Sequence, residues 1–229
     1  MNSQTFFRKT ELTEGQADNK EGLVLSMPSS YIKMHVGTKE TSFSKADISI
    51  MYDSNAYIYC FYTVTNDEIK WDKNENGYTC TLSWDNYLCK FWNDNVENEL
   101  LITPSIDKFI NEFERATNIR EINAYRGFVN YDLDEKIKNS EYFEIVKKDG
   151  IQAVYSKLKK YEDEREYRFA IVDESKPSHV ELNINTDDII FYNITLRKGK
   201  SIVFMLNNIQ FGSDGIIKSF SKNIGFKYL

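Results

Sequence analysis

Residues 56–65 read AYIYCFYTVT, an almost unbroken run of aromatic and β-branched side chains. Such side chains favour a strand because they pack well against neighbours on a pleated surface. Apolar side chains stand at both the odd and the even positions of this run, so both faces of the strand should be covered. We therefore expect this segment to be the central strand of a sheet.

The pattern on either side of this strand predicts a chain that mixes strands and helices. Residues 166–172 (EYRFAIV) predict a second strong strand. Shorter strands are expected at residues 5–10, 23–26, 31–36, 100–102, 127–131, 180–184, 189–194 and 201–206. Helices are expected at residues 104–117, 141–148 and 151–161, and charged loops at residues 11–22 and 68–77. The predicted fold is α+β, with a mixed, mostly antiparallel sheet and one or two packed helices, in a single domain of residues 1–229.

Composition limits the partners that the protein can have. The 29 basic and 35 acidic side chains give a net charge of −6. Duplex nucleic acid is usually held by a basic stripe, whereas the basic run 157–160 leads straight into the acidic run 162–164. We therefore expect nucleic acid only as a modified substrate. Three cysteines and two histidines form no disulfide or zinc pattern, and the sequence contains no signal or membrane-spanning run. A cytoplasmic protein without a metal site or a membrane contact is expected.

Short catalytic motifs do not identify a reaction. The sequence has no Walker A loop, no GxGxxG, no HExxH and no GxSxG. Because His35 and His179 are far apart, a device that needs histidine beside serine or cysteine is not expected. Candidate chemistry therefore has to come from carboxylates, arginines and hydroxyl groups.

The segment 160–172 (KYEDEREYRFAIV) carries four carboxylates immediately before and within a predicted strand. Alternation along the strand places Glu164, Glu166 and Arg168 on one face and apolar side chains on the other. We expect the charged face either to be exposed to solvent or to line a cleft. Alternatively, the carboxylates pair with Arg165 and Arg168 as surface ion pairs of little energetic weight.

Two further strands carry candidate ligand-binding side chains. On residues 5–10, Arg8 and Thr10 share a face, and the planar guanidinium of Arg8 suits a phosphate or a carboxylate. Alternatively, Arg8 pairs with an acid of the following loop, Asp18 or Glu21. At the end of the central strand, Thr63 could contact a ligand, although the aromatic residues around it could equally belong to the core.

Three segments resemble a widespread group of uncharacterised bacterial proteins that are often found among mobile-element and defence genes. These segments are residues 15–22 with their acidic-glycine pattern, the aromatic strand 57–62, and residues 160–168 with the ending Glu-x-Glu-Tyr-Arg. Residues 182–190 (LNINTDDII) fit more weakly. The resemblance implies a setting in bacterial defence and does not imply an activity.

A second resemblance is mechanistic, to ADP-ribosyltransferases of the arginine type. It is carried by Arg8 early in a strand, the hydroxyl-bearing residues 63–65, and the late Glu164-Arg165-Glu166. It implies an NAD-using enzyme of toxin or antiphage-defence type, with an antitoxin as one possible protein partner. Here Thr-Val-Thr replaces the usual Ser-Thr-Ser, and the loop before Glu164 is unusually acidic.

The same resemblance implies a role for each candidate residue. Glu166 would be catalytic, and Glu164 would orient the target group. Arg8 would bind the NAD phosphates, and Thr63 would support Glu166. Thr10 and Arg168 would complete the cofactor site.

Two other functions stay open. A non-enzymatic sensing or interaction protein could use a surface that contains Trp71, Trp84 and Trp92. A magnesium-dependent nuclease could use the acids of residues 162–166 together with Asp18.

Overall fold

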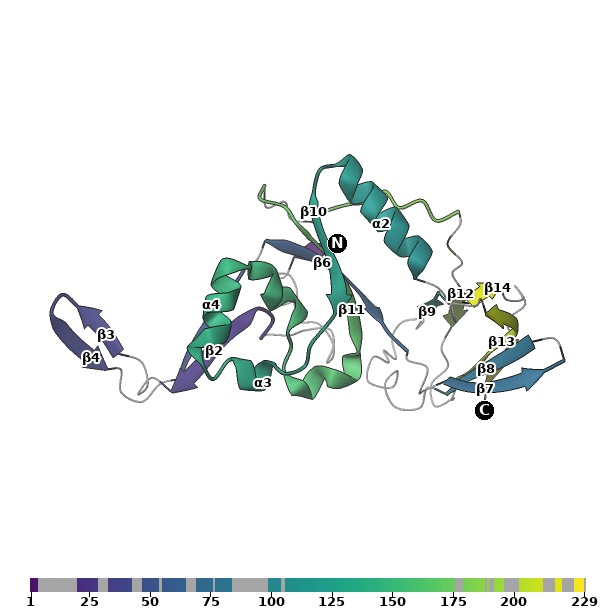
Figure 1. Ribbon diagram of the computed structural model, residues 1–229, viewed down its shortest axis with the longest axis horizontal. Helices are drawn as coiled ribbons and strands as arrows, with labels where there is room; N and C mark the ends of the chain where they lie inside the picture. The colour runs from purple at the N-terminus through teal and green to yellow at the C-terminus, as the bar shows by residue number, and fades with distance from the viewer. Residues whose placement is uncertain are drawn as a thin grey trace. The chain divides into compact units, whose positions relative to one another are not determined.

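The structure is a computed structural model (Figure 1), and the chain groups into two compact units. It describes residues 1–3, 20–28, 33–42, 47–53, 55–64, 69–75, 77–83, 99–103, 106–175, 179–187, 189, 192–195, 202–211, 217–219 and 225–228. Unit 1 comprises Met1–Tyr62 and Thr117–Leu182, and unit 2 comprises Thr63–Ala116 and Asn183–Leu229. The organisation as a single domain stays a prediction.

Unit 1 is built on a four-stranded antiparallel sheet in the order β1-β6-β11-β10. The bounds are β1 Asn2–Ser3, β6 Ala56–Tyr62, β10 Asn123–Phe128 and β11 Glu166–Val172. The prediction of an interior strand at residues 56–65 is confirmed, although β6 ends three residues earlier. The strand at residues 166–172 has the predicted bounds, and the strand expected at residues 127–131 begins earlier and ends at Phe128.

The expectation that both faces of β6 are covered holds only for its first half. Ala56, Tyr57 and Ile58 are buried, whereas the side of the strand at Tyr59 opens to solvent, with 44% of that residue exposed. The sheet therefore has a fully packed end and a more open end. Glu166 lies opposite Tyr62 at the open end, and Val172 lies opposite Ala56 at the packed end.

Helical segments of unit 1 follow β10 along the chain. They are α3 Leu133–Lys136, α4 Ser140–Lys148 and the 3-10 helices η4 Gly150–Tyr155 and η5 Lys159–Glu164. The helix predicted at residues 141–148 is confirmed as α4. A continuous helix at residues 151–161 is wrong, because Ser156 has extended backbone and forms a parallel bridge with Asn130. The pairing with the segment after β10 thus divides the predicted helix into η4 and η5.

Among the described residues, the core of unit 1 contains two apolar clusters, and η4 contributes to both. One cluster consists of Leu23, Val24, Leu133, Ile137, Tyr142, Val146 and Ala153. The other consists of Ala56, Ile58, Ile151, Val154 and Ala170. Ala153 belongs to the first cluster and its neighbour Val154 to the second, so η4 packs on the sheet on one side and on the helices on the other.

Two further antiparallel strand pairs belong to the described part of unit 1, namely β2 Leu23–Pro28 with β5 Asp47–Met51 and β3 Lys33–Val36 with β4 Lys39–Ser42. They confirm the strands expected at residues 23–26 and 31–36, with adjusted bounds. The strand expected at residues 180–184 is wrong: Val180 exchanges backbone hydrogen bonds with Met1, and the residues after it form no strand. The strand expected at residues 5–10 lies outside the described residues.

The described part of unit 2 consists mainly of antiparallel strands. They are β7 Ile69–Asn74, β8 Gly77–Ser83, β9 Glu99–Ile102, β12 Tyr192–Thr195, β13 Ile202–Phe211, β14 Ile217–Ser219 and β15 Gly225–Tyr228. The charged loop expected at residues 68–77 is wrong, because β7 pairs with β8 at the edge of a sheet. An edge strand tolerates charge, and Lys70 and Asp72 are exposed there.

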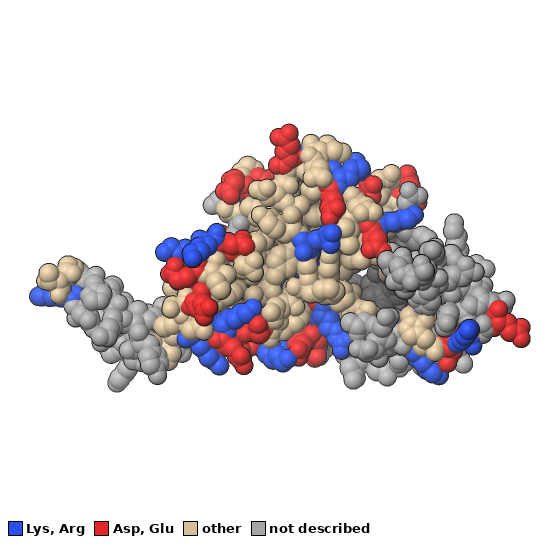
Figure 2. All heavy atoms as spheres, in the orientation of Figure 1, with Lys and Arg blue, Asp and Glu red and all other residues tan. Residues whose placement is uncertain are grey.

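Helix α2 Asp107–Ile119 runs across the division between the units and confirms the helix predicted at residues 104–117, with a later start. Helices and antiparallel sheets in one chain confirm the α+β class. Among the described residues, no helix combines the length and the apolar composition that a membrane crossing requires. Figure 2 shows acidic and basic side chains interspersed over the described part of one face.

Candidate functional site: a buried array of ionisable side chains

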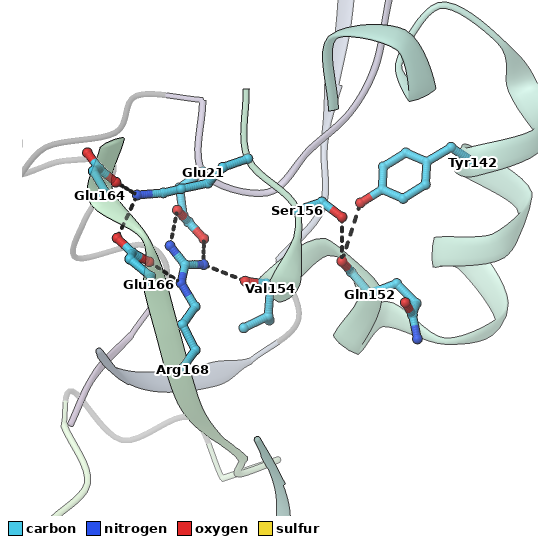
Figure 3. A network of polar contacts seen from close by, with 9 residues as sticks. Glu21, Tyr142, Gln152, Val154, Ser156, Glu164, Glu166 and Arg168 are labelled. Carbon is cyan, nitrogen blue, oxygen red and sulfur yellow. Dashed lines mark hydrogen bonds and ion pairs between the residues drawn. The ribbon is translucent and has the colours of Figure 1, made fainter. Parts of the chain in front are cut away.

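Five ionisable side chains meet inside unit 1 and form what we call the buried array: Glu21, Lys157, Glu164, Glu166 and Arg168 (Figure 3). They come from four places in the chain. Glu166 and Arg168 lie on β11, Glu164 ends η5, Lys157 lies between η4 and η5, and Glu21 lies in the turn before β2. Buried charges are costly unless they are paired, so the contacts within the array decide its properties.

Arg168 is the centre of one half of the array and is only 3% exposed. Its Nη1 and Nη2 lie 2.7 Å and 3.2 Å from the two carboxylate oxygens of Glu21. Its Nε donates to Oε2 of Glu166 at 2.5 Å, and its Nη1 also donates to the carbonyl oxygen of Val154. All three guanidinium nitrogens are therefore engaged by groups of the chain itself.

Lys157 is the centre of the other half. Its buried ammonium donates to Oε1 of Glu166 at 2.9 Å and also to Oε2 of Glu164. The ring of Tyr161 lies 5.2 Å from the ammonium nitrogen, at a distance that suits a cation–π contact. One ammonium thus holds two carboxyl groups that are two residues apart in sequence.

The backbone between η5 and β11 explains how two such close neighbours converge. Arg165 has a left-handed conformation, with φ 42° and ψ 49°. A residue other than glycine rarely adopts positive φ. The sharp turn at Arg165 carries the chain from the end of η5 into β11 and allows Glu164 and Glu166 to reach the same ammonium.

The two carboxyl groups have opposite pKa shifts. Burial raises the pKa of Glu164 to about 7, although the charge of Lys157 acts in the opposite direction. Burial alone would also raise the pKa of Glu166, but the charges of Arg168 and Lys157 hold it well below its ordinary value. At neutral pH, Glu166 is ionised and Glu164 lies close to its titration midpoint.

The structure brings together three of the predicted site residues, Glu164, Glu166 and Arg168. The expectation that they face solvent is wrong for Glu164 and Arg168, which are buried, whereas Glu166 is half-buried. Pairing of a carboxylate with Arg168 is confirmed, but as a buried contact and not as a weak surface pair. The role of Arg168 in binding a cofactor stays a prediction, and all three guanidinium nitrogens have acceptors within the chain.

The other predicted residues have different outcomes. Arg8 and Thr10 lie outside the described residues, as does Asp18. Thr63 is half-buried and directly follows Tyr62, the cross-strand neighbour of Glu166. Of the tryptophans, Trp71 is half-buried, and Trp84 and Trp92 lie outside the described residues.

Sequence reasoning overlooked two members of the array. Glu21 was considered only as a partner of Arg8, whereas it binds Arg168, 147 residues away. Lys157 was considered only as part of a basic run. Lys157 follows the apolar residues of η4 closely in the sequence, and this position was the pattern that could have indicated a buried lysine.

The array contains oxygen donors that metals could use, but its carboxylates are bound to cations of the chain. Within the described ranges, no group of three or more His, Cys, Asp or Glu side chains is arranged to hold a metal ion. Two carboxyl groups with separated pKa values are instead suited to hold negative charge at one position and to move a proton at the other.

No family model, no curated protein and no solved structure matches the chain.

Proposed function

We propose that the chain is an ADP-ribosyltransferase-like enzyme that uses NAD, of the bacterial toxin or antiphage-defence type, with Glu166 and Glu164 at its reaction centre. One observation carries the proposal: both carboxyl groups contact the ammonium of Lys157, and their pKa values are shifted in opposite directions. Titratable pairs separated in this way are typical of acid–base sites.

The chemistry of ADP-ribose transfer fits this pair. The bond between ribose C1′ and the nicotinamide nitrogen breaks with its electrons on nicotinamide, and positive charge develops on the ribose. Glu166, which stays ionised, stabilises that charge. Glu164 accepts the proton of the attacking group, as a carboxyl group with a pKa near neutrality can do efficiently.

Arg168 and Lys157 have supporting roles in this proposal. A carboxylate offers about four lone-pair positions, and the two cations occupy one on each oxygen of Glu166. A hydrogen bond between the Glu164 and Glu166 side chains uses a third position, which leaves about one for a substrate. In this proposal Arg168 positions Glu166, Arg8 and Thr10 bind NAD, and Thr63 supports Glu166.

The direct test is incubation of the purified chain with NAD labelled in the adenosine and nicotinamide parts. We expect nicotinamide release and label transfer, with a loss of about 100-fold or more in Glu166→Gln. Glu164→Gln should lose the dependence of the rate on a group that titrates near pH 7. Glu162→Gln is the matched control, because Glu162 forms an exposed pair with Lys159 outside the array. Absence of both products with the wild-type chain would refute the proposal.

A second function is favoured by a different aspect of the same array. The ion pairs of the array can also be explained by a purely structural role, in which they hold β11, η5 and the turn before β2 together. A non-enzymatic sensing or interaction protein of bacterial defence would need the array only for this structural role. One stoichiometric partner in affinity purification, together with no NAD turnover, would support this second function. The magnesium-dependent nuclease stays a third prediction, because Asp18 lies outside the described residues.

A further inference from the structure

Tyr131 lies between β10 and α3, in a segment that is tied to the buried array by its backbone. The N–H of Val129 donates to the carbonyl of Glu166 at 3.0 Å. The N–H of Lys157 donates to the carbonyl of Asn130 at 2.9 Å, and the N–H of Leu133 donates to the carbonyl of Lys157 at 3.2 Å. Hydrogen bonds to two members of the array thus flank Tyr131 on both sides and fix its position beside them.

The hydroxyl group of Tyr131 also contacts a member of the array, Glu166. Its oxygen accepts the backbone N–H of Glu166 at 2.8 Å. Burial raises the pKa of Tyr131 to about 12, so the hydroxyl keeps its hydrogen at neutral pH. A phenol can donate and accept at the same time, and this contact uses only its oxygen. No described residue accepts the phenolic hydrogen, and the side chain is half-buried.

A hydroxyl group of a ligand would complement this arrangement. Such a group donates its hydrogen to a carboxylate and accepts a hydrogen from a phenol through the same oxygen atom. Glu166 supplies the ionised carboxylate, and Tyr131 supplies the phenol next to the backbone of Glu166. A ligand oxygen that only accepts would satisfy Tyr131 but not Glu166.

We propose that Tyr131 is a substrate-binding residue of the array, which donates its phenolic hydrogen to a ribose hydroxyl group that in turn donates to Glu166. This inference rests on the proposed use of NAD and adds a group that recognises the nicotinamide-bearing ribose. Water alone at the same position is the competing occupant.

A thermodynamic cycle tests the inference. The probes are NAD and two analogues whose nicotinamide-bearing ribose lacks either the 2′- or the 3′-hydroxyl group, and the measurements are Kd by calorimetry, KM and kcat. We expect the wild-type chain to bind one analogue at least about 10-fold more weakly than NAD, because the missing hydroxyl group loses both the hydrogen bond from Tyr131 and the charge-assisted one to Glu166. Tyr131→Phe loses only the first of these bonds, so it should weaken NAD binding by roughly 3–10-fold and leave the affinity for that one analogue unchanged.

The control variant is Tyr142→Phe, which removes a buried hydroxyl that donates to the carbonyl of Gln152. It should bind NAD and both analogues as the wild-type chain does. Melting temperatures of both variants separate a loss of binding from a loss of folded protein.

Three results would overturn the inference. The first is a wild-type chain that binds both analogues as tightly as NAD, a result that does not depend on whether the variant folds. The second is a Tyr131→Phe variant that loses the same affinity for NAD and for both analogues, which would assign the hydroxyl a purely structural role. In both cases, loss of turnover in Glu166→Gln would leave the proposed function standing. The third is a wild-type chain that neither binds nor consumes NAD, which removes the proposed function as well.

Discussion

Arg168 and Glu21 form a nearly solvent-free ion pair, with side-chain exposures of 3% and 2%. Charges in such a position have lost their hydration, and each depends on the other for compensation. Replacing a whole buried pair by apolar residues can be neutral, but removing one partner leaves an uncompensated charge. The array therefore constrains single substitutions far more than it adds net stability.

We predict that Glu21→Gln lowers the free energy of unfolding by about 3–5 kcal/mol. Urea denaturation followed by tryptophan fluorescence measures the change. Glu162→Gln removes an exposed partner of Lys159 and should change the same quantity by no more than about 1 kcal/mol. Equal effects of the two substitutions would show that the guanidinium of Arg168 does not depend on Glu21.

For single residues, the sequence predicts on which face of a strand a side chain lies, but not the residue with which it forms an ion pair. Glu166 and Arg168 lie on β11 and contact each other, as the alternation along this strand predicts, whereas Glu164 lies at the end of η5 and reaches Lys157 through the turn at Arg165. Glu21 could not be assigned to Arg168, because no local period links residues 147 positions apart. Lys157 was also missed, since burial of a lysine is decided by the carboxylates that surround it in space.

Among the helical elements, α4 has the clearest local determinants. The side chain of Asn139 accepts the backbone N–H groups of Glu141 at 3.0 Å and Tyr142 at 3.4 Å. These contacts satisfy donors that the first turn of a helix leaves open. On the inner face, Tyr142 and Val146 are buried in the first apolar cluster.

We predict that Asn139→Ala lowers the free energy of unfolding by about 1 kcal/mol through loss of the cap. Asn139→Ser keeps an oxygen acceptor at the same position and should recover most of that loss. Thermal melts of the three chains at one pH give the comparison. An alanine variant as stable as the wild-type chain would mean that packing alone determines where α4 begins.

The predicted elements failed where tertiary pairing overrides a local pattern. Residues 151–161 have apolar side chains with helical spacing, yet the bridge between Ser156 and Asn130 breaks the helix into η4 and η5. Residues 69–74 were expected to form a loop because they carry many charges, yet they form β7 at the edge of a sheet. The helix at residues 141–148 was predicted correctly because the capping residue before it and the spacing of its apolar side chains both indicate a helix there.

For the molecule as a whole, the array links folding to pH. Burial raises the pKa of Glu164 from 4.5 to about 7, so the native state binds more protons than the unfolded state between these values. Stability must then fall as the pH rises through this window. Glu166 acts in the opposite sense, because its lowered pKa contributes stability that is lost as the pH falls below its ordinary value. The array is therefore most stabilising at weakly acidic pH.

We predict that the free energy of unfolding of the wild-type chain decreases by on the order of 2 kcal/mol between pH 5 and pH 8. Glu164→Gln should remove this decrease, whereas Glu162→Gln should retain it. Urea denaturation at intervals of half a pH unit gives the three curves. A wild-type curve that rises over this range and is parallel to that of Glu164→Gln would contradict the assignment of the bound proton to Glu164.

The distance along the chain between Glu21 and Arg168 has a consequence for biosynthesis. A ribosome adds about 5–20 residues per second, so Arg168 leaves it roughly 7–30 s after Glu21, with 147 positions between them. Throughout that interval the nascent chain carries an acidic side chain whose counter-ion does not yet exist. Unit 1 can thus acquire its final interior only late in translation, after the whole intervening segment 63–116 of unit 2 has been made.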